Sequence, residues 1–172
     1  MAVGSVQITG TGQLLDLSRR LRAAGGPRLQ QNLNRRIRRA AEPLHADMRS
    51  TIRNLPIDSE PRKPGSRGGP SPTTRPLRAT IAEAVRLSVR TGRSPGARVW
   101  IDKSALPSDL KFMPEAMNKT DGRLRHKVFG NKKRWVNKHL PPMWWDKVVA
   151  RHTPRMRAEV ERVLGDVRRT IT

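Results

Sequence analysis

The sequence predicts an α+β fold in which a small antiparallel sheet packs against a long N-terminal amphipathic helix and a C-terminal helix. Apolar residues recur every three or four positions over residues 28–55 and again over residues 143–169, which is the period of an amphipathic helix. Between these segments, residues 85–91 and 97–102 alternate apolar and polar side chains, as half-buried strands do. One long helix before the strands and another after them fit a two-layer sandwich of sheet and helices. The chain has 172 residues, the size of one domain, and we expect a single domain over residues 1–172.

The N-terminal part predicts a short strand followed by a helix. Residues 5–9 alternate weakly, with Val6 and Ile8 on one side. Leucines at helical spacing over residues 13–24 predict a helix, which ends at the Gly-Gly-Pro of residues 25–27 because glycine ends helices and proline starts them.

A second, longer helix is expected to begin near Arg28 and to run for about seven turns. Its apolar stripe consists of Leu29, Leu33, Ile37, Ala40, Leu44, Met48, Ile52 and Leu55. The opposite face carries Arg35, Arg36, Arg38, Arg39 and Arg49, an arrangement that most often means only a solvated face. Pro43 lies inside this pattern and removes a backbone donor, so we expect the helix to bend near Ala40.

Residues 56–76 have the composition of an extended arm or linker. They contain six prolines and three glycines, which hold neither a helix nor a strand ladder. Loops of this length are usually either functional or flexible. Two interpretations therefore stay open: a floppy linker, or an arm that becomes ordered against a neighbouring subunit.

The middle of the chain predicts a hairpin and a broken helix. Residues 77–91 are expected to form a strand that is entered through a short turn, and residues 97–102 return as a second strand after the turn at 92–96. The alternation places Trp100 on the face opposite Val99 and Ile101, and we expect its ring to join a core.

After the hairpin, residues 103–118 predict a short helix that Pro107 and Pro114 interrupt, and residues 125–129 predict a further strand. The final helix is expected to run from Met143 to about Arg169, with a second kink at Pro154. Its apolar stripe consists of Trp145, Val148, Val149, Met156, Val160, Val163, Leu164 and Val167.

The charge of the chain restricts its partners. There are 36 Lys and Arg residues against 14 Asp and Glu residues, a formal net charge of +22. This excess predicts a polyanion or an acidic protein as partner. The absence of cysteine excludes disulfides and thiolate sites. We expect no membrane-spanning segment and no signal peptide, and hence a soluble protein that is made in the cytoplasm.

The sequence predicts no catalytic site. It contains none of the phosphate-binding, nucleophile-elbow or zinc-protease motifs. The four histidines lie among basic residues, where packing or surface roles are usual. The acidic residues Asp109, Glu115, Asp121 and Asp146 are too isolated to hold Mg²⁺. We therefore expect no enzyme, no metal, no cofactor and no small-molecule substrate.

Residues 125–145 combine the unusual features of the chain. Three of the four tryptophans, Trp135, Trp144 and Trp145, lie here together with Phe129 and a basic loop. Apolar surface beside many cations suggests a docking surface. Neighbouring residues on a helix point about 100° apart, so we expect Trp144 and Trp145 not to enter one small core together and one of them to meet another chain.

The order of these features resembles that of the head–tail connector proteins of long-tailed bacteriophages, the neck and tail-completion, or minor tail, family. Its matching positions are Val6, Ile8, Gly10, Arg125, His126, Val128, Phe129, Gly130, Trp135, Val136, Pro141 and Pro142. The resemblance covers nearly the whole chain, and its specific part is residues 125–142. Similar proteins commonly carry proline after the histidine, where this chain has Lys127.

The resemblance implies a structural virion protein, made in the host cytoplasm, that forms a ring at the junction of head and tail and joins the head connector to the tail tube. A six-fold ring is expected, with neighbouring neck and tail-tube proteins as partners. We expect subunit or partner contacts at Trp135, Trp144, Trp145, Phe129 and Val136. Contacts with acidic neighbours, or with DNA that passes through the ring, are expected at Arg125, Lys132, Lys133, Arg134 and Lys138.

Two alternatives remain open from the sequence. The first is a nucleic-acid-binding protein that reads no sequence, since the chain is rich in cations and poor in the aromatic residues that stack on single-stranded bases. The second and weaker one is a nuclease.

Overall fold

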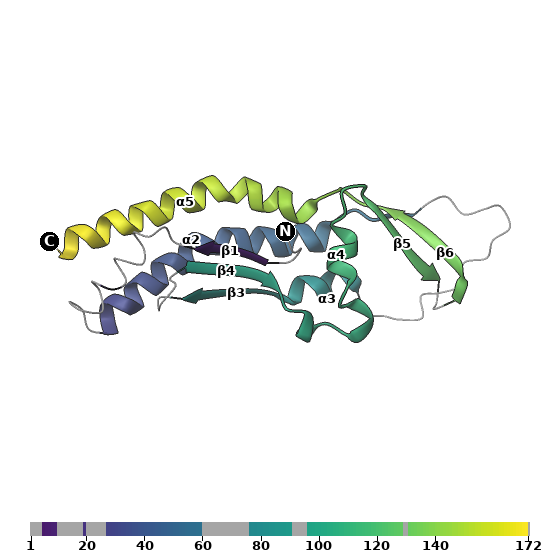
Figure 1. Ribbon diagram of the computed structural model, residues 1–172, viewed down its shortest axis with the longest axis horizontal. Helices are drawn as coiled ribbons and strands as arrows, with labels where there is room; N and C mark the ends of the chain where they lie inside the picture. The colour runs from purple at the N-terminus through teal and green to yellow at the C-terminus, as the bar shows by residue number, and fades with distance from the viewer. Residues whose placement is uncertain are drawn as a thin grey trace.

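The computed structural model describes residues 5–9, 19, 27–59, 76–90, 96–128 and 131–171. The protein has the α+β fold that the sequence predicts. Two long helices, α2 (Pro27–Asn54) and α5 (Trp144–Ile171), lie side by side along the molecule, as Figure 1 shows. A sheet packs on α2 at one end, and a second, separate sheet extends away from the helices at the other end. The expected helix over residues 13–24 and most of the arm, residues 60–75, lie outside the described residues.

Helix α2 supplies the longest apolar stripe of the core. Leu33, Leu44, Met48 and Ile52 are buried, as the helical spacing predicts, and Ala41 is buried where Ala40 was expected. Pro43 is accommodated inside the continuous helix. Figure 1 shows α2 changing direction part-way along, in agreement with the bend that a proline imposes.

The first sheet has the strand order β1-β4-β3 and is antiparallel throughout. Strand β1 (Ser5–Thr9) confirms the predicted N-terminal strand, and β3 (Val85–Arg90) with β4 (Gly96–Ile101) confirms the predicted hairpin. Val99 and Ile101 of β4 are buried. Trp100 points to the opposite face, where it is half-buried beneath the Arg98 guanidinium, 5.2 Å from its carbon to the ring centroid. The expectation that Trp100 joins the core is therefore wrong.

A short helix, α3 (Leu77–Glu83), precedes β3 where the sequence predicted a turn into a strand. It begins after Pro76, and it buries Ile81 and Ala82 against α2. Its seven residues are too few to show a clear helical period. The Arg78 Nη1 atom donates a hydrogen bond to the Leu55 carbonyl, 2.8 Å away, and so ties α3 to the end of α2.

The predicted broken helix is confirmed as three short turns, η1 (Lys103–Ala105), η2 (Ser108–Leu110) and α4 (Met113–Met117). Asp102 caps the first of them, since its Oδ1 atom accepts hydrogen bonds from the Ser104 amide at 3.0 Å and the Ser104 hydroxyl at 2.5 Å. The hydroxyl bond is the main reason that the pKa of Asp102 lies below its usual value. These turns carry the chain from the first sheet to the other end of the molecule (Figure 1).

The second sheet has the order β2-β6-β5, with β2 (Asp58–Ser59), β5 (Arg123–Val128) and β6 (Asn131–His139). The expectation of one small sheet is therefore wrong, because β5 pairs with β6 and not with the first hairpin. The basic stretch Lys132, Lys133 and Arg134 was expected to be a loop, but it is part of strand β6. The register pairs Trp135 with Lys127 and Asn131 with Val128, so these three residues lie in the irregular part of the hairpin and have no partner in the β5–β6 ladder.

Helix α5 closes the core from the other side of α2. Trp144 and Trp145 are both 2% exposed, and their rings meet edge to face with centroids 5.8 Å apart and planes at 81°. Farther along α5, Val148, Met156 and Val163 are also buried. The helix contains Pro154 without interruption.

Candidate functional site

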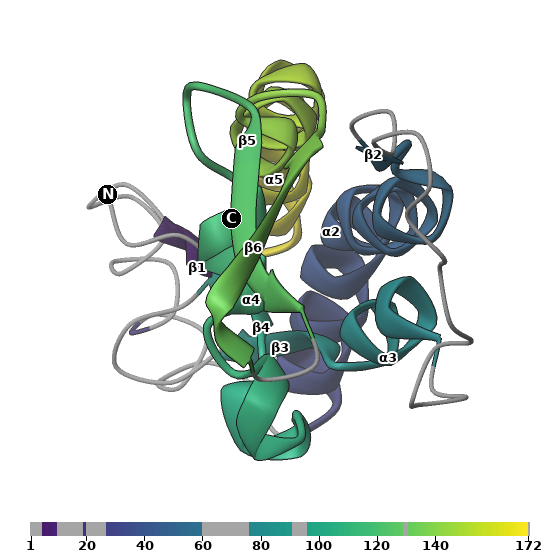
Figure 2. The same ribbon diagram turned by 90° about the vertical axis from the view of Figure 1, so that its right-hand side faces the viewer.

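The β5–β6 hairpin extends away from the two long helices (Figure 1), and Figure 2 shows it from its end, in front of the helices. Its register pairs Arg123 with His139, Arg125 with Asn137 and Lys127 with Trp135. An irregularity follows between Lys127 and Val128, next to the turn. Strand β2 borders β6 only at Lys138 and His139, so beyond these positions the described part of this sheet is a two-stranded ribbon.

The two faces of the hairpin differ in exposure. In an antiparallel pair, directly opposite residues lie on the same face of the sheet, and so do residues two apart on one strand. One face of the hairpin therefore carries Arg123, Arg125, Trp135 and His139. All four are exposed. Lys133 is exposed as well, and it lies two positions before Trp135 in the irregular part of β6, where no β5 partner fixes its face. We call these five residues the outward face. Leu124, on the other face, is 4% exposed and belongs to the core.

An arginine–tryptophan stack lies at the centre of the outward face. The Arg125 guanidinium carbon is 4.8 Å from the centroid of the Trp135 ring, which fits a cation–π contact. The Trp135 side chain nevertheless stays 45% exposed. Diagonal neighbours on adjacent strands are close enough for long side chains to meet in this way. The Arg125 guanidinium and the Trp135 ring therefore lie against each other on this face.

The charge of the hairpin has one sign. Residues 123–139 include seven cations and no Asp or Glu: Arg123, Arg125, Lys127, Lys132, Lys133, Arg134 and Lys138. Such a one-sided distribution focuses a positive potential along the ribbon. The hairpin thus combines a projecting shape with a uniform charge.

A tight polar junction anchors the base of the hairpin to the body. The Leu140 amide donates to the Gly122 carbonyl at 2.8 Å. Gly122 has a φ of 62°, and an added Cβ would lie 2.5 Å from the Leu140 carbonyl oxygen, so the backbone here accepts only glycine without a shift. The Asp121 carboxylate accepts the Arg123 amide at 3.0 Å.

Asn118, at the end of α4, connects that helix to α5. It is 4% exposed, its Oδ1 atom accepts the Trp145 amide at 2.8 Å, and its Nδ2 atom donates to Asp146 Oδ2 at 2.7 Å. The Asn118 side chain therefore satisfies the Trp145 amide, a backbone donor in the first turn of α5 that has no partner within the helix. Sequence analysis missed Asn118, since it lies far from the helix along the chain and no local pattern marks it.

Of the five residues that the sequence proposed as a subunit interface, the structure describes four, and it does not gather these four on one surface. Trp144 and Trp145 both lie in the core, so the expectation that they cannot enter it together is wrong. Trp135 lies on the outward face, and Val136 is half-buried. Phe129 lies outside the described residues.

The cations that were predicted to contact an acidic partner or DNA lie in the same hairpin. Arg125 and Lys133 are on the outward face, and Lys138 is half-buried near its base. Lys132 and Arg134 occupy strand positions in β6.

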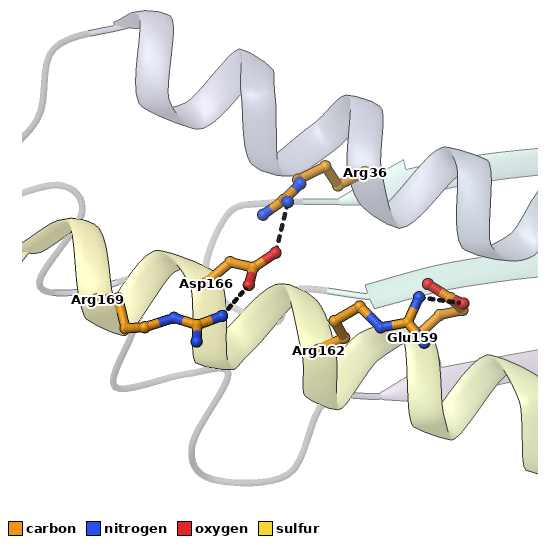
Figure 3. Close-up of polar contacts among 5 residues, drawn as sticks. All are labelled: Arg36, Glu159, Arg162, Asp166 and Arg169. Atoms are coloured by element: carbon orange, nitrogen blue, oxygen red, sulfur yellow. Dashed lines mark hydrogen bonds and ion pairs between the residues drawn. The ribbon is translucent and has the colours of Figure 1, made fainter.

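A second group of charged residues joins α2 to α5. Arg36 of α2 donates to Asp166 Oδ2 at 2.6 Å, and Arg169 donates to Asp166 Oδ1 at 2.6 Å, as Figure 3 shows. The bonds from Arg169 and then from Arg36 hold the pKa of Asp166 below its usual value. Deeper along the same contact, Asp47 lies 2.8 Å from His152 and 3.2 Å from Arg151. These ion pairs join the two long helices and have the character of structural contacts.

The structure describes no arrangement suited to metal chemistry. Among the described residues, no three His, Asp or Glu side chains gather closely enough to hold an ion. No described helix is long and apolar enough to cross a membrane.

No family model, no curated protein and no solved structure matches the chain.

Proposed function

We propose that the protein is a non-enzymatic structural component of a long-tailed bacteriophage, located at the neck and tail of the virion after synthesis in the host cytoplasm. In this proposal it forms a homo-oligomeric ring, with six-fold symmetry, that joins the head connector to the tail tube. The observation that carries the proposal is the basic β5–β6 hairpin, which extends from a body that buries its own core. An element of this kind is suited to reach a neighbouring component of an assembly.

Further support comes from the resemblance of residues 125–142 and from the charge. A subunit with a net charge of +22 repels its own copies at low salt. Neighbours of opposite charge relieve this repulsion, which favours assembly over an isolated role. Trp144 and Trp145 are not contact residues in this proposal, because both are buried within the chain itself.

Removal of the gene from the phage tests the proposal. We expect lysates with separate heads and finished tails by electron microscopy, and joined particles when the wild-type gene is supplied from a plasmid. Trp135→Ala supplied in the same way should restore few joined particles. The matched control is Phe112→Ala, which removes another exposed aromatic residue outside the hairpin, 73% exposed, and should restore them fully. Joined, infectious particles in the absence of the gene would rule out the proposal.

The mass of the purified protein gives a second test. Subunits of 19.4 kDa predict about 116 kDa for a six-fold ring by light scattering, either alone or after addition of neck and tail components. A chain that stays monomeric with all of these components present would contradict ring formation.

The alternative function, sequence-independent binding of nucleic acid, is favoured by the uniform charge of the same hairpin. It predicts that the isolated chain binds a duplex of any sequence, with an affinity that falls as the salt concentration rises.

A further inference from the structure

The outward face has the composition of a surface that meets a polyanion. Arg123, Arg125 and Lys133 are exposed on it, with Trp135 between them. Protein–protein interfaces are depleted of charge at their centre, and lysine is rare there. Interfaces with DNA are more polar and much more positive. Tryptophan and arginine are also enriched in protein–protein interfaces, so the Arg125–Trp135 stack does not decide between the two classes. The exposed Lys133 and the absence of Asp and Glu among residues 123–139 favour the second class.

A second copy of the chain is a poor partner for this face. Two such faces would oppose Arg123, Arg125 and Lys133 to the same three cations. The chain has only 14 acidic residues, and several of those on the described surface are already engaged within the chain, including Asp47, Glu115, Glu159 and Asp166. The partner must therefore bring its own negative charge.

The shape of the hairpin selects among polyanions. The major groove of B-DNA is about 12 Å wide and admits a two-stranded β-ribbon. Beyond its base, the described part of the β5–β6 sheet is such a ribbon.

We infer that the β5–β6 hairpin binds the phosphate backbone of duplex DNA through its outward face, with Arg123, Arg125 and Lys133 as the phosphate contacts. Trp135 acts as a positioning residue, because its ring lies against the Arg125 guanidinium. The inferred contacts are with phosphates, which position a protein on the duplex and carry no sequence information directly.

This inference deepens the proposed function and rests on it in one respect. It names DNA as the component that the hairpin reaches, and it thereby moves Trp135 from a subunit contact to the DNA-facing side. Binding of DNA by a single chain does not require a ring, so the two can fail separately. A ring that ignores DNA would overturn only the inference, and a DNA-binding chain that phage particles do not need would overturn only the proposed function.

The test is the binding of the full chain to a fluorescently labelled duplex at a series of salt concentrations. The hairpin variant R123Q/R125Q/K133Q removes the three phosphate contacts. The matched control R38Q/R39Q/R157Q removes three exposed arginines from α2 and α5, and therefore the same charge. We expect the slope of log affinity against log salt to fall in magnitude by about 2.7 in the hairpin variant, at about 0.9 per phosphate. In the control it should change by less than about 1.

Three results would overturn the inference. The first is the absence of duplex binding by the wild type at low salt. The second is an equal change of slope in the two variants, which would mean that net charge alone attracts DNA. The third is displacement of the duplex by polyglutamate at equal charge concentration, which would assign the face to acidic proteins. Thermal unfolding of both variants should match the wild type, since all six positions are exposed.

Trp135→Leu separates the positioning role from charge. It removes the ring beneath Arg125 but no cation, so the salt slope should stay unchanged while affinity falls about two- to fivefold, the strength of an exposed cation–π contact. Unchanged affinity would remove the positioning role from Trp135.

Discussion

Replacement of Asn118 by alanine should destabilise the protein strongly, although Asn118 is a single polar residue outside any long helix. The change leaves the buried Trp145 amide without its acceptor and the Asp146 carboxylate without the Asn118 donor. A buried donor without a partner costs about 1–3 kcal/mol, and a lost helix cap costs a similar amount. These two costs belong in part to the same hydrogen bond, between Asn118 and the Trp145 amide, so they do not simply add. We therefore expect a loss of about 2–3 kcal/mol in the free energy of unfolding.

Thermal and urea unfolding followed by circular dichroism measure this loss. For a chain of this length, each kcal/mol shifts the midpoint by about 2–4 °C, so Asn118→Ala should melt about 4–12 °C below the wild type. The matched control is Asn54→Ala, an exposed asparagine at the end of α2, which should change stability by less than about 0.5 kcal/mol.

The comparison of these two variants also tests the role of the Asn118 side chain. Equal effects of Asn118→Ala and Asn54→Ala would mean that the side chain of Asn118 does not satisfy the start of α5 and does not join the end of α4 to this helix. The double variant with Asp146→Ala should be less damaging than the sum of the two single variants, because the residues share one hydrogen bond.

Three further variants test other parts of the fold. Gly122→Ala should lower the free energy of unfolding by about 2–3 kcal/mol, since the added Cβ meets a backbone oxygen at 2.5 Å and φ is positive; a melting point equal to the wild type would contradict the close approach. Gly165→Ala, with nothing within 4 Å, should instead stabilise α5 by about 0.5–1 kcal/mol in the same melts, and a loss of stability would show a contact that the packing does not predict. Asp166→Asn should reduce stability at neutral pH in low salt, because the carboxylate pairs with two arginines. The folded-state pKa of Asp166 is lowered, so its contribution is present above the unfolded value of 3.8 and lost as pH falls through the folded value. The difference between variant and wild type in urea unfolding should therefore disappear in acid, and a difference that persists there would exclude the ion pairs as its cause.

The sequence alone predicts the elements whose period is long enough to be unambiguous. The stripe of α2 and the stripe of α5 each repeat over several turns, and the alternation around Val99 fixes both the strand and its buried face. The seven residues of α3 and the lysine-rich part of β6 carry no such signal. Packing against α2 decides the structure of α3, because local preference is weak there.

For the candidate site, the sequence indicates the right segment but not the role of each residue in it. Composition alone marks residues 125–145 as basic and rich in tryptophan. Only the tertiary structure separates Trp135, on the outward face, from Trp144 and Trp145, in the core. The physical reason is that the first turn of α5 is surrounded by several elements at once, so two rings that point apart can both be buried. Burial depends on what packs around a side chain, and residues distant in the sequence, such as Leu124 and Met117, supply that surrounding.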